Sequence, residues 1–151
     1  MECPGSRTVL FEEKENANEA TGSIKSELRQ WPIQLHLISP AAPYYQGADV
    51  VLTADCVAYA LGGYHQNYLK GKSVAIACPK LDEDQEVYIE KIRSWFDDAK
   101  INTLTVMIMQ VPCCGGLLRL AQEAMKKSER KVPVKSIVVG LQGEILNEQW
   151  I

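Results

Sequence analysis

The feature of this sequence that most constrains its fold is an apolar run, residues 104–111, that ends in Pro-Cys-Cys-Gly-Gly at residues 112–116. A pattern typical of a helix begins immediately afterwards. The combination predicts a buried strand that passes through a tight turn into a helix. Glycine lets the backbone turn sharply and come close to a bulky ligand. The N-terminus of a helix also places partial positive charge beside any thiolate.

Apolar runs and helical patterns alternate along the rest of the chain. Strands are predicted at residues 8–11, 33–38, 50–53, 73–77, 104–111, 134–139 and 145–146, long helices at 82–98 and 116–128, and short helical turns at 56–61 and 64–70. Strands that are apolar almost throughout are typical of a parallel sheet buried on both faces. The sequence therefore predicts an α/β fold, a three-layer, open, mostly parallel sheet of the Rossmann/flavodoxin-like kind with helices on both faces.

The length of 151 residues fits a single domain with its own apolar core. Residues 1–30 are predicted to form an N-terminal arm or linker, and residues 31–151 a single α/β domain. A net charge of −3 gives no reason to expect nucleic acid or an anionic membrane as a partner. No apolar run approaches the ~20 residues of a membrane-spanning helix, and no signal-peptide pattern opens the chain. We therefore expect a cytoplasmic protein, and a homo-oligomer is compatible with the sequence.

Four cysteines follow predicted strands. Cys56, Cys78 and the adjacent pair Cys113 and Cys114 each come just after an apolar run. The carboxyl ends of parallel strands meet at one edge of the sheet, where ligands bind. Five cysteines in all is an odd number for a disulfide framework. We therefore expect these thiols to converge on a metal site, with Cys3 from the arm as a further candidate ligand.

Thiolate ligands favour iron–sulfur clusters and zinc over hard cations. The backbone N–H groups of Gly115 and Gly116 are expected to donate hydrogen bonds to the sulfides of a cluster, which makes both glycines candidate cofactor-binding residues. Zinc sites more typically show paired Cys-x-x-Cys or Cys/His ligands, which are absent here. An iron–sulfur cluster is therefore the first expectation and zinc is the alternative.

Two other interpretations of the thiols stay open. In a metal-free thiol protein, Cys113 or Cys114 would be the nucleophile at the start of a helix, and Cys56 or Cys78 would be the resolving partner. Alternatively, the cysteines are small apolar core residues, as buried cysteines often are. No Gly-x-Gly-x-x-Gly or P-loop lysine motif supports a nucleotide cofactor.

Charged and imidazole side chains near the cysteines have simpler interpretations. His36 is expected to be a hydrogen-bonded core or edge residue rather than a ligand. His65 lies in a segment bounded by glycines and fits the surface as well as a position behind the site. Asp55 and Lys80 lie beside cysteines and are expected to be solvated residues of the sheet edge.

Several motifs together are similar to those of one known family. They are Leu28-Arg29-Gln30-Trp31-Pro32, Gln34-Leu35-His36-Leu37, Gly47-Ala48-Asp49, Ala54-Asp55-Cys56-Val57-Ala58-Tyr59, Ala77-Cys78-Pro79-Lys80-Leu81-Asp82 and Val111-Pro112-Cys113-Cys114-Gly115. With these motifs the chain resembles the prokaryotic ferredoxin-like (4Fe-4S) iron–sulfur cluster-binding proteins over almost its whole length. Typical members begin with a ferredoxin module that repeats a Cys-x-x-Cys-x-x-Cys-x-x-x-Cys-Pro pattern, which this chain lacks. The resemblance therefore implies the C-terminal domain of such a protein.

The sequence and the resemblance together predict an electron-transfer domain, or an accessory domain of an oxidoreductase. Its iron–sulfur cluster, of the 4Fe-4S type by the resemblance, would be held by Cys56, Cys78, Cys113 and Cys114, with Cys3 as an alternative ligand. The expected partner is a ferredoxin module or another redox protein. A metal-free thiol redox protein and a protein-interaction domain with structural zinc are the alternatives.

Overall fold

The computed structural model describes residues 6–11 and 23–151 of the chain. The strands are β1 (Val9–Leu10), β2 (Gln30–Trp31), β3 (Asp49–Ala54), β4 (Ser73–Ala77), β5 (Thr103–Met109), β6 (Val134–Val139) and β7 (Ile145–Trp150). The α-helices are α1 (Val57–Ala60), α2 (Gln85–Asp97) and α3 (Gly115–Lys127). Short 3₁₀ or π segments are η2 (Pro43–Tyr45), η3 (His65–Leu69) and η4 (Pro112–Cys114).

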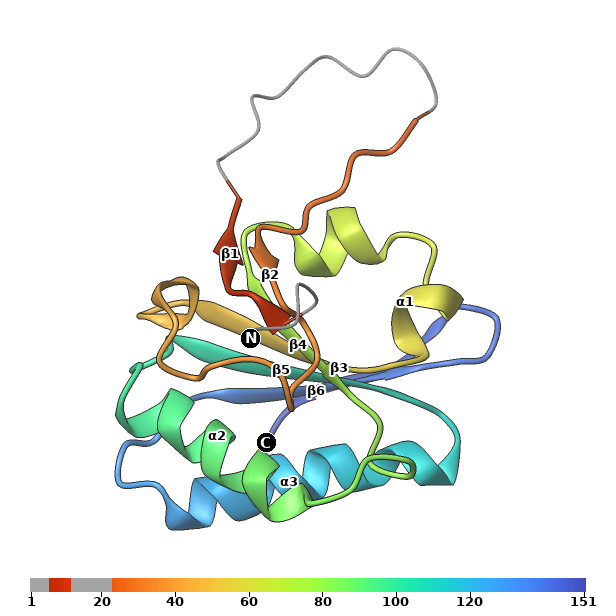
Figure 1. Cartoon of the computed structure of the whole chain (residues 1–151). Coiled ribbons are helices and arrows are strands. Elements are labelled where there is room, and N and C mark those ends of the chain that lie inside the picture. Colours follow the sequence, from red (N-terminus) through yellow and green to blue (C-terminus); the bar gives the residue numbers. More distant parts are fainter. Residues whose placement is uncertain (1–5, 12–22) are drawn as a thin grey trace.

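Five strands form the central sheet in the order β4-β3-β5-β6-β7. The first four are parallel, and β7 runs antiparallel to β6. Helices α2 and α3 cover one face of the sheet, while α1 and η3 lie on the other (Figure 1). The predicted three-layer, mostly parallel α/β fold is therefore confirmed.

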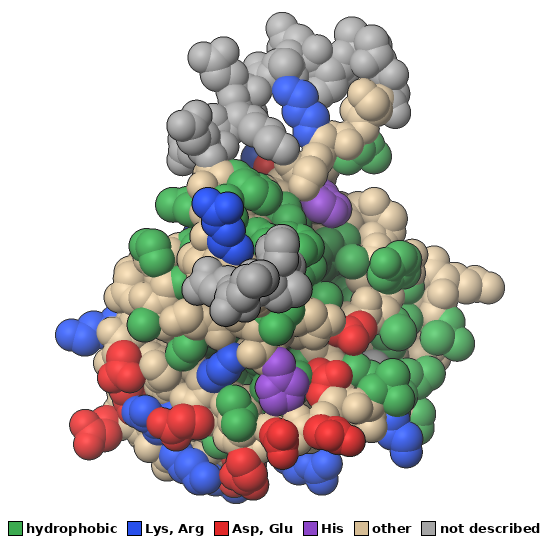
Figure 2. All heavy atoms as spheres, viewed as in Figure 1, with side chains coloured by type: hydrophobic (Ala, Val, Ile, Leu, Met, Phe, Trp, Pro, Cys, Tyr) green, Lys and Arg blue, Asp and Glu red, His purple; other side chains and the backbone are tan. Residues whose placement is uncertain are grey.

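The two long helices bury the faces that their periodicity predicts. In α2 the aromatic residues Tyr88, Trp95 and Phe96 are fully buried, and in α3 Leu117 and Ala121 are fully buried. Apolar residues spaced three or four apart lie on one side of a helix, so this side packs on the sheet. Acidic and basic side chains are mixed over the outer sides of both helices rather than gathered into one charged surface (Figure 2).

The predicted strand at residues 33–38 is wrong. Only Gln34 forms a bridge, to Ile76 of β4, and the chain then turns so that the amides of Leu37 and Ile38 both donate to the Gln34 carbonyl. Lys91 of α2 stabilises this turn, because its ammonium group donates to three carbonyls, those of Leu35 (2.7 Å), His36 (3.0 Å) and Ile38 (2.8 Å). Carbonyls that would belong to a strand ladder are therefore satisfied by a side chain from the helix.

The N-terminal part of the described chain adds a small second sheet. The predicted strand at residues 8–11 is confirmed as β1, which pairs antiparallel with β2. Gln30 in β2 is fully buried and donates to the carbonyl of Val74 in β4 at 2.7 Å, while its side-chain oxygen accepts from the Val74 amide at 2.8 Å. A buried amide side chain needs such partners, so Gln30 attaches β2 firmly to the main sheet.

The last strand is longer than predicted. The sequence indicates a strand only at residues 145–146, whereas β7 continues to Trp150. Its middle residues Asn147, Glu148 and Gln149 are polar and exposed, so no apolar alternation marks them as strand. In the described ranges, no helix has the length and apolar character needed to cross a bilayer.

Candidate functional site

The order of the strands defines where this sheet can bind a ligand. From β3 the chain crosses to β4 on one side, and it then returns past β3 to β5 on the other side. In open α/β sheets, ligands bind outside the carboxyl ends of the strands at the point where the direction of winding reverses. That point lies between β3 and β5, and the loops after these strands carry Cys56 and Cys113.

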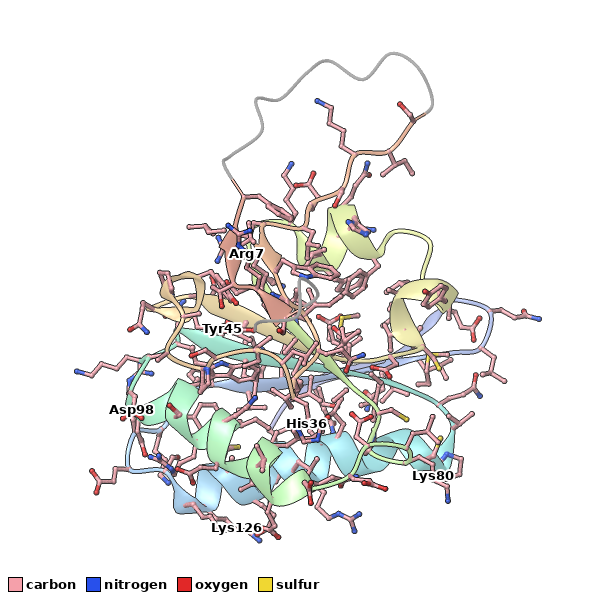
Figure 3. The ribbon with its side chains drawn as sticks, viewed as in Figure 1. Arg7, His36, Tyr45, Lys80, Asp98 and Lys126 are labelled. Atoms are coloured by element: carbon pink, nitrogen blue, oxygen red, sulfur yellow. The ribbon has the colours of Figure 1, made fainter. Side chains whose placement is uncertain are left out.

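Three loops meet at this edge. The amide of Asp55, after β3, donates to the carbonyl of Ala77 at the end of β4 (3.1 Å). A Cβ built on Gly116, at the start of α3, would lie 3.0 Å from Cβ of Pro79, which follows Cys78. The absence of a side chain at Gly116 therefore lets α3 begin directly against the loop after β4. Figure 3 shows Lys80, the next residue of that loop, beside the first turn of α3.

The cysteines that are predicted to be metal ligands are distributed over these three loops. Cys56 and Cys113 are exposed, Cys78 is half-buried, and all three are free thiols. The side chain of Cys114 and the whole of Cys3 lie outside the described residues. The structure thus places three of the five predicted ligands on neighbouring loops at one edge of the sheet. Their role as ligands stays a prediction.

Asp82 holds the loop that carries Cys78. One oxygen of its carboxylate, Oδ2, accepts a hydrogen bond from the amide of Cys78 (2.9 Å) and another from the hydroxyl of Tyr88 in α2. The Asp82 amide in turn donates to the Cys78 carbonyl (2.9 Å), which closes a five-residue turn. The predicted helix at residues 82–98 therefore begins only at Gln85, because Asp82 belongs to this turn.

The carboxyl groups of Asp55 and Asp82 lie near each other beside the Cys78 loop. Burial raises the pKa of the Asp55 carboxyl, and the charge of Asp82 raises it further. Oδ1 of Asp55 is shielded from solvent and has no hydrogen-bond partner among the described residues. Burial also raises the pKa of Tyr88, and its hydrogen bond to Asp82 adds to that rise. These effects favour the uncharged forms of Asp55 and Tyr88 beside the site. Asp55 is only partly exposed, whereas a solvated residue was expected at this position.

The two histidines lie on different parts of the molecule. His36 is exposed, its Nε2 lies 2.6 Å from the carbonyl of Glu83, and its ring packs on Tyr88 with the centroids 4.3 Å apart. His65, in η3, accepts a hydrogen bond at Nδ1 from the amide of Glu27 (3.0 Å). His65 also lines a hollow of ≈ 330 Å³, which is bounded by residues 24–26 and by Gly62 as well. His36 is thus hydrogen-bonded, as expected of a core or edge residue, and it lies at the surface.

The glycine pair differs in its surroundings. A Cβ on Gly115 would meet nothing within 4 Å, whereas one on Gly116 would press on Pro79. Both residues belong to α3, which follows η4 without a break. The amide of Gly115 donates to the carbonyl of Pro112 in η4, so this expected donor already has a partner. The N–H groups that follow it lack partners within the helix, as in the first turn of any α-helix. Cofactor binding by Gly115 and Gly116 stays a prediction.

The side chains at this edge match a metal centre in ligand type but not in spacing. Thiolates are the ligands that thiophilic metals prefer, so the chemistry of Cys56, Cys78 and Cys113 fits such a group. Within residues 6–11 and 23–151, however, no three His, Cys, Asp or Glu side chains lie close enough together to hold one metal ion. The described residues thus offer the right ligand type without a compact site for a single ion.

Asp82 and Tyr88 also lie at this edge, although the sequence did not indicate a role for them there. The signal for Asp82 is its position four residues after Cys78, in a loop where a short side chain can accept a backbone hydrogen bond. Tyr88 carries no such signal, because its periodic spacing on α2 assigns it only to the core.

Comparisons with known proteins bear on the fold and on the resemblance. A family model described as a Rossmann-like domain matches residues 42–151. An uncharacterized protein from Archaeoglobus fulgidus is 27% identical over 121 residues, which is 79% of this chain and 83% of the relative. No solved structure matches. The resemblance to the ferredoxin-like (4Fe-4S) proteins is therefore wrong as an identification, because the matching family is a different one and the relative has no known function.

Proposed function

This chain belongs to the family of Rossmann-like domains, and from that premise we propose that it is a redox domain whose cysteines bind an iron–sulfur cluster. The proposal rests on one observation: the loops after β3, β4 and β5 each carry a free cysteine at the carboxyl edge of the sheet. Open α/β sheets bind their ligands at this edge. We assign the ligand roles to Cys56, Cys78, Cys113 and Cys114. Cys3 is an alternative ligand.

A cluster fits these residues better than a single zinc ion. Because the described residues hold no compact set of three donors, a structural zinc site has no support among them. A cluster of several irons takes thiolates from a wider surrounding and can use two adjacent cysteines. When bound, it would supply one-electron transfer, and a redox protein would be the partner. Free thiols of this kind persist in a reducing compartment, so we place the protein in the cytoplasm.

The chain's own residues would prepare the edge for the cluster. Asp82 holds the turn that presents Cys78. Gly116 lets the start of α3 approach Pro79, so the loops that carry Cys78 and Cys113 stay close. The N–H of Gly115 already donates to Pro112, so Gly116 is the glycine whose N–H would donate a hydrogen bond to a sulfur atom, which tunes the potential of a cluster.

The first experiment is a measurement of iron and acid-labile sulfide in protein purified without oxygen and reconstituted anaerobically. We expect iron and sulfide in matching amounts, and absorbance near ~400 nm that falls on reduction. Cys78→Ser should lose most of both. Lys126→Ala, at the opposite end of α3 from Cys113 (Figure 3), is the control and should bind as the wild type does. Absence of iron, or a Cys78→Ser variant with unchanged iron, would refute the proposal.

A second candidate is a metal-free thiol redox protein. The observation that favours it is the exposure of Cys56 and Cys113, which leaves both thiols open to small reagents. In this case the protein would bind no iron and would form an intramolecular disulfide on mild oxidation, seen as a loss of two mass units. Alkylation of the reduced protein would identify the reactive cysteine as the one that is labelled first. Stoichiometric zinc without redox activity would instead indicate the structural-zinc alternative.

A further inference from the structure

The two outer edges of the central sheet are treated differently by the rest of the chain. At β4, the amide and carbonyl of Val74 bond to the side chain of Gln30. The amide of Ile76 donates to Ile33 (2.8 Å), and its carbonyl accepts from the amide of Leu35 (2.9 Å). The groups of β4 that face outward are thus satisfied, and this edge is closed to further strands.

The edge at β7 is open. The amide of Ile151 donates to the carbonyl of Val134 (2.8 Å), which fixes the alternation of this antiparallel pair. Every second residue faces β6, so the backbone groups of Glu148 and Trp150 face away from the sheet. They have no backbone partner among the described residues. All six residues of β7 are exposed.

Exposed apolar side chains lie at both ends of this open edge. Ile145, Leu146, Trp150 and Ile151 are 36%, 51%, 60% and 47% exposed. Natural sheets discourage edge pairing with charges, prolines or bulges. Here the only charged residue of β7 is Glu148, which forms an ion pair with Lys135 of β6, and the one bulge lies at the beginning of the strand. After the bulge, the protection of this edge against a further strand therefore depends on one ion-paired charge.

We propose that β7 is the interface of a homodimer, in which it pairs antiparallel with β7 of a second copy. The pairing rule allows only registers that set outward-facing residues opposite one another. A two-fold axis at Glu148 sets Leu146 opposite Trp150 and Asn147 opposite Gln149, all within the regular part of the strand after the bulge. Apolar residues thus meet apolar residues, and amides meet amides. Aromatic–aliphatic cross-strand pairs of this kind stabilise sheets.

The charge at the axis is compatible with this arrangement. Two copies of Glu148 would face each other, but each carboxylate is already paired with Lys135 of its own chain. The next allowed register, with the axis at Gln149, would set Glu148 opposite Trp150 and Asn147 opposite Ile151. That register places polar groups against apolar ones, so self-complementarity selects the axis at Glu148.

The test uses two variants of β7. Each variant alone should fail to dimerise, and an equimolar mixture of the two should form a dimer. Leu146→Glu and Trp150→Lys each put a charge against an apolar residue of the second copy. In an equimolar mixture, the new carboxylate of one variant would meet the new ammonium group of the other, while the unchanged Trp150 and Leu146 pair at the other end. Sedimentation velocity over a concentration series should show a dimer for the wild type, monomers for each variant, and a dimer for the mixture.

A backbone variant and a surface control complete the experiment. Glu148→Pro removes the N–H at the axis, which the β6–β7 ladder does not use, and should give a monomer with an unchanged far-ultraviolet circular dichroism spectrum. Lys126→Ala on α3 should remain dimeric. A wild-type protein that is monomeric throughout would overturn the proposal, and so would a dimer that survives all three β7 variants. A mixture that stays monomeric would refute the register. None of these outcomes depends on metal binding.

Discussion

At the scale of single residues, Asp82 connects the loop of Cys78 to helix α2. Its Oδ2 accepts from the Cys78 amide and from the Tyr88 hydroxyl, and the Tyr88 side chain is fully buried. Asp82→Ala would leave that hydroxyl without a partner, which costs about 1–3 kcal/mol. We expect urea unfolding to show a loss of this size. Glu83→Ala, an exposed neighbour, should change stability by less than about 0.5 kcal/mol, and an equal effect of both variants would contradict this role.

Tyr64 predicts a dependence of stability on alkaline pH. Burial raises the pKa of Tyr64 to about 12, although its hydrogen bond with Thr53 (2.7 Å) lowers it. The unfolded state loses this proton near pH 10 and the folded state only near pH 12, so the contribution of Tyr64 is complete below pH 10 and falls as the pH rises to 12.

The variant Tyr64→Phe isolates this effect. At pH 8 it should be less stable than the wild type by about 1 kcal/mol, because the buried Thr53 hydroxyl loses its partner. From pH 10 upward the difference in stability between the two proteins should shrink, since only the wild type loses the contribution of the protonated Tyr64 hydroxyl. Urea unfolding of both proteins between pH 8 and pH 11 measures the difference, and a constant difference would show that Tyr64 does not titrate as described.

The sequence identifies the cysteines of this edge more readily than the residues that support them. Cys56 and Cys78 are visible because each follows an apolar run, and the ends of parallel strands meet at one edge. The contact between Tyr88 and Asp82 depends instead on how α2 docks on the sheet. No local pattern in one sequence encodes that angle, so this part of the site required the structure.

At the scale of elements, the start of α3 depends on the lack of a side chain at Gly116. Its Cβ would lie 3.0 Å from Pro79, so Gly116→Val should push α3 away from the loop after β4. Overpacking of this kind typically costs about 1–3 kcal/mol, measurable by urea unfolding. Alkylation of Cys78, which is half-buried in the wild type, should become faster because the loop beside it opens.

Gly115 supplies the matched control for that variant. A Cβ at this position meets nothing within 4 Å, so Gly115→Ala should leave alkylation of Cys78 unchanged. Its stability should be equal to that of the wild type or higher by up to about 1 kcal/mol, because alanine favours a helix over glycine. If both variants accelerate alkylation equally, the effect belongs to the helix as a whole and not to the contact with Pro79.

Most elements could be predicted from the sequence, and the exceptions share a physical cause. The strand at residues 134–139 and the long helices follow from apolar periodicity, which reports burial against the sheet. The segment at residues 33–38 has the composition of a strand, but Lys91 takes its carbonyls. Strand β7 is exposed throughout, so its pairing with β6 leaves no apolar pattern in the sequence.

At the scale of the whole molecule, the family comparison separates fold from chemistry. The match to a Rossmann-like domain covers residues 42–151, and the observed mostly parallel sheet agrees with it. A fold of this kind hosts many unrelated functions, so function has to be argued from the loops. The short motifs around the cysteines resemble another family, but motifs of a few residues describe local chemistry and do not identify the family to which a chain belongs.

Binding of a metal centre is predicted to stabilise the entire domain, because the proposed ligands come from the loops after β3, β4 and β5. Such a centre forms only when the folded sheet brings these loops together, so it adds to the free energy of unfolding. A ligand that binds only the folded state at 100 times its Kd adds about 2.7 kcal/mol. For a domain of this length, that corresponds to a rise in Tm of roughly 5–10 °C. Anaerobic calorimetry of loaded and metal-free protein measures the rise. Lys126→Ala should show it and Cys78→Ser should not, whereas equal Tm values for loaded and metal-free wild type would place the centre outside the folded edge.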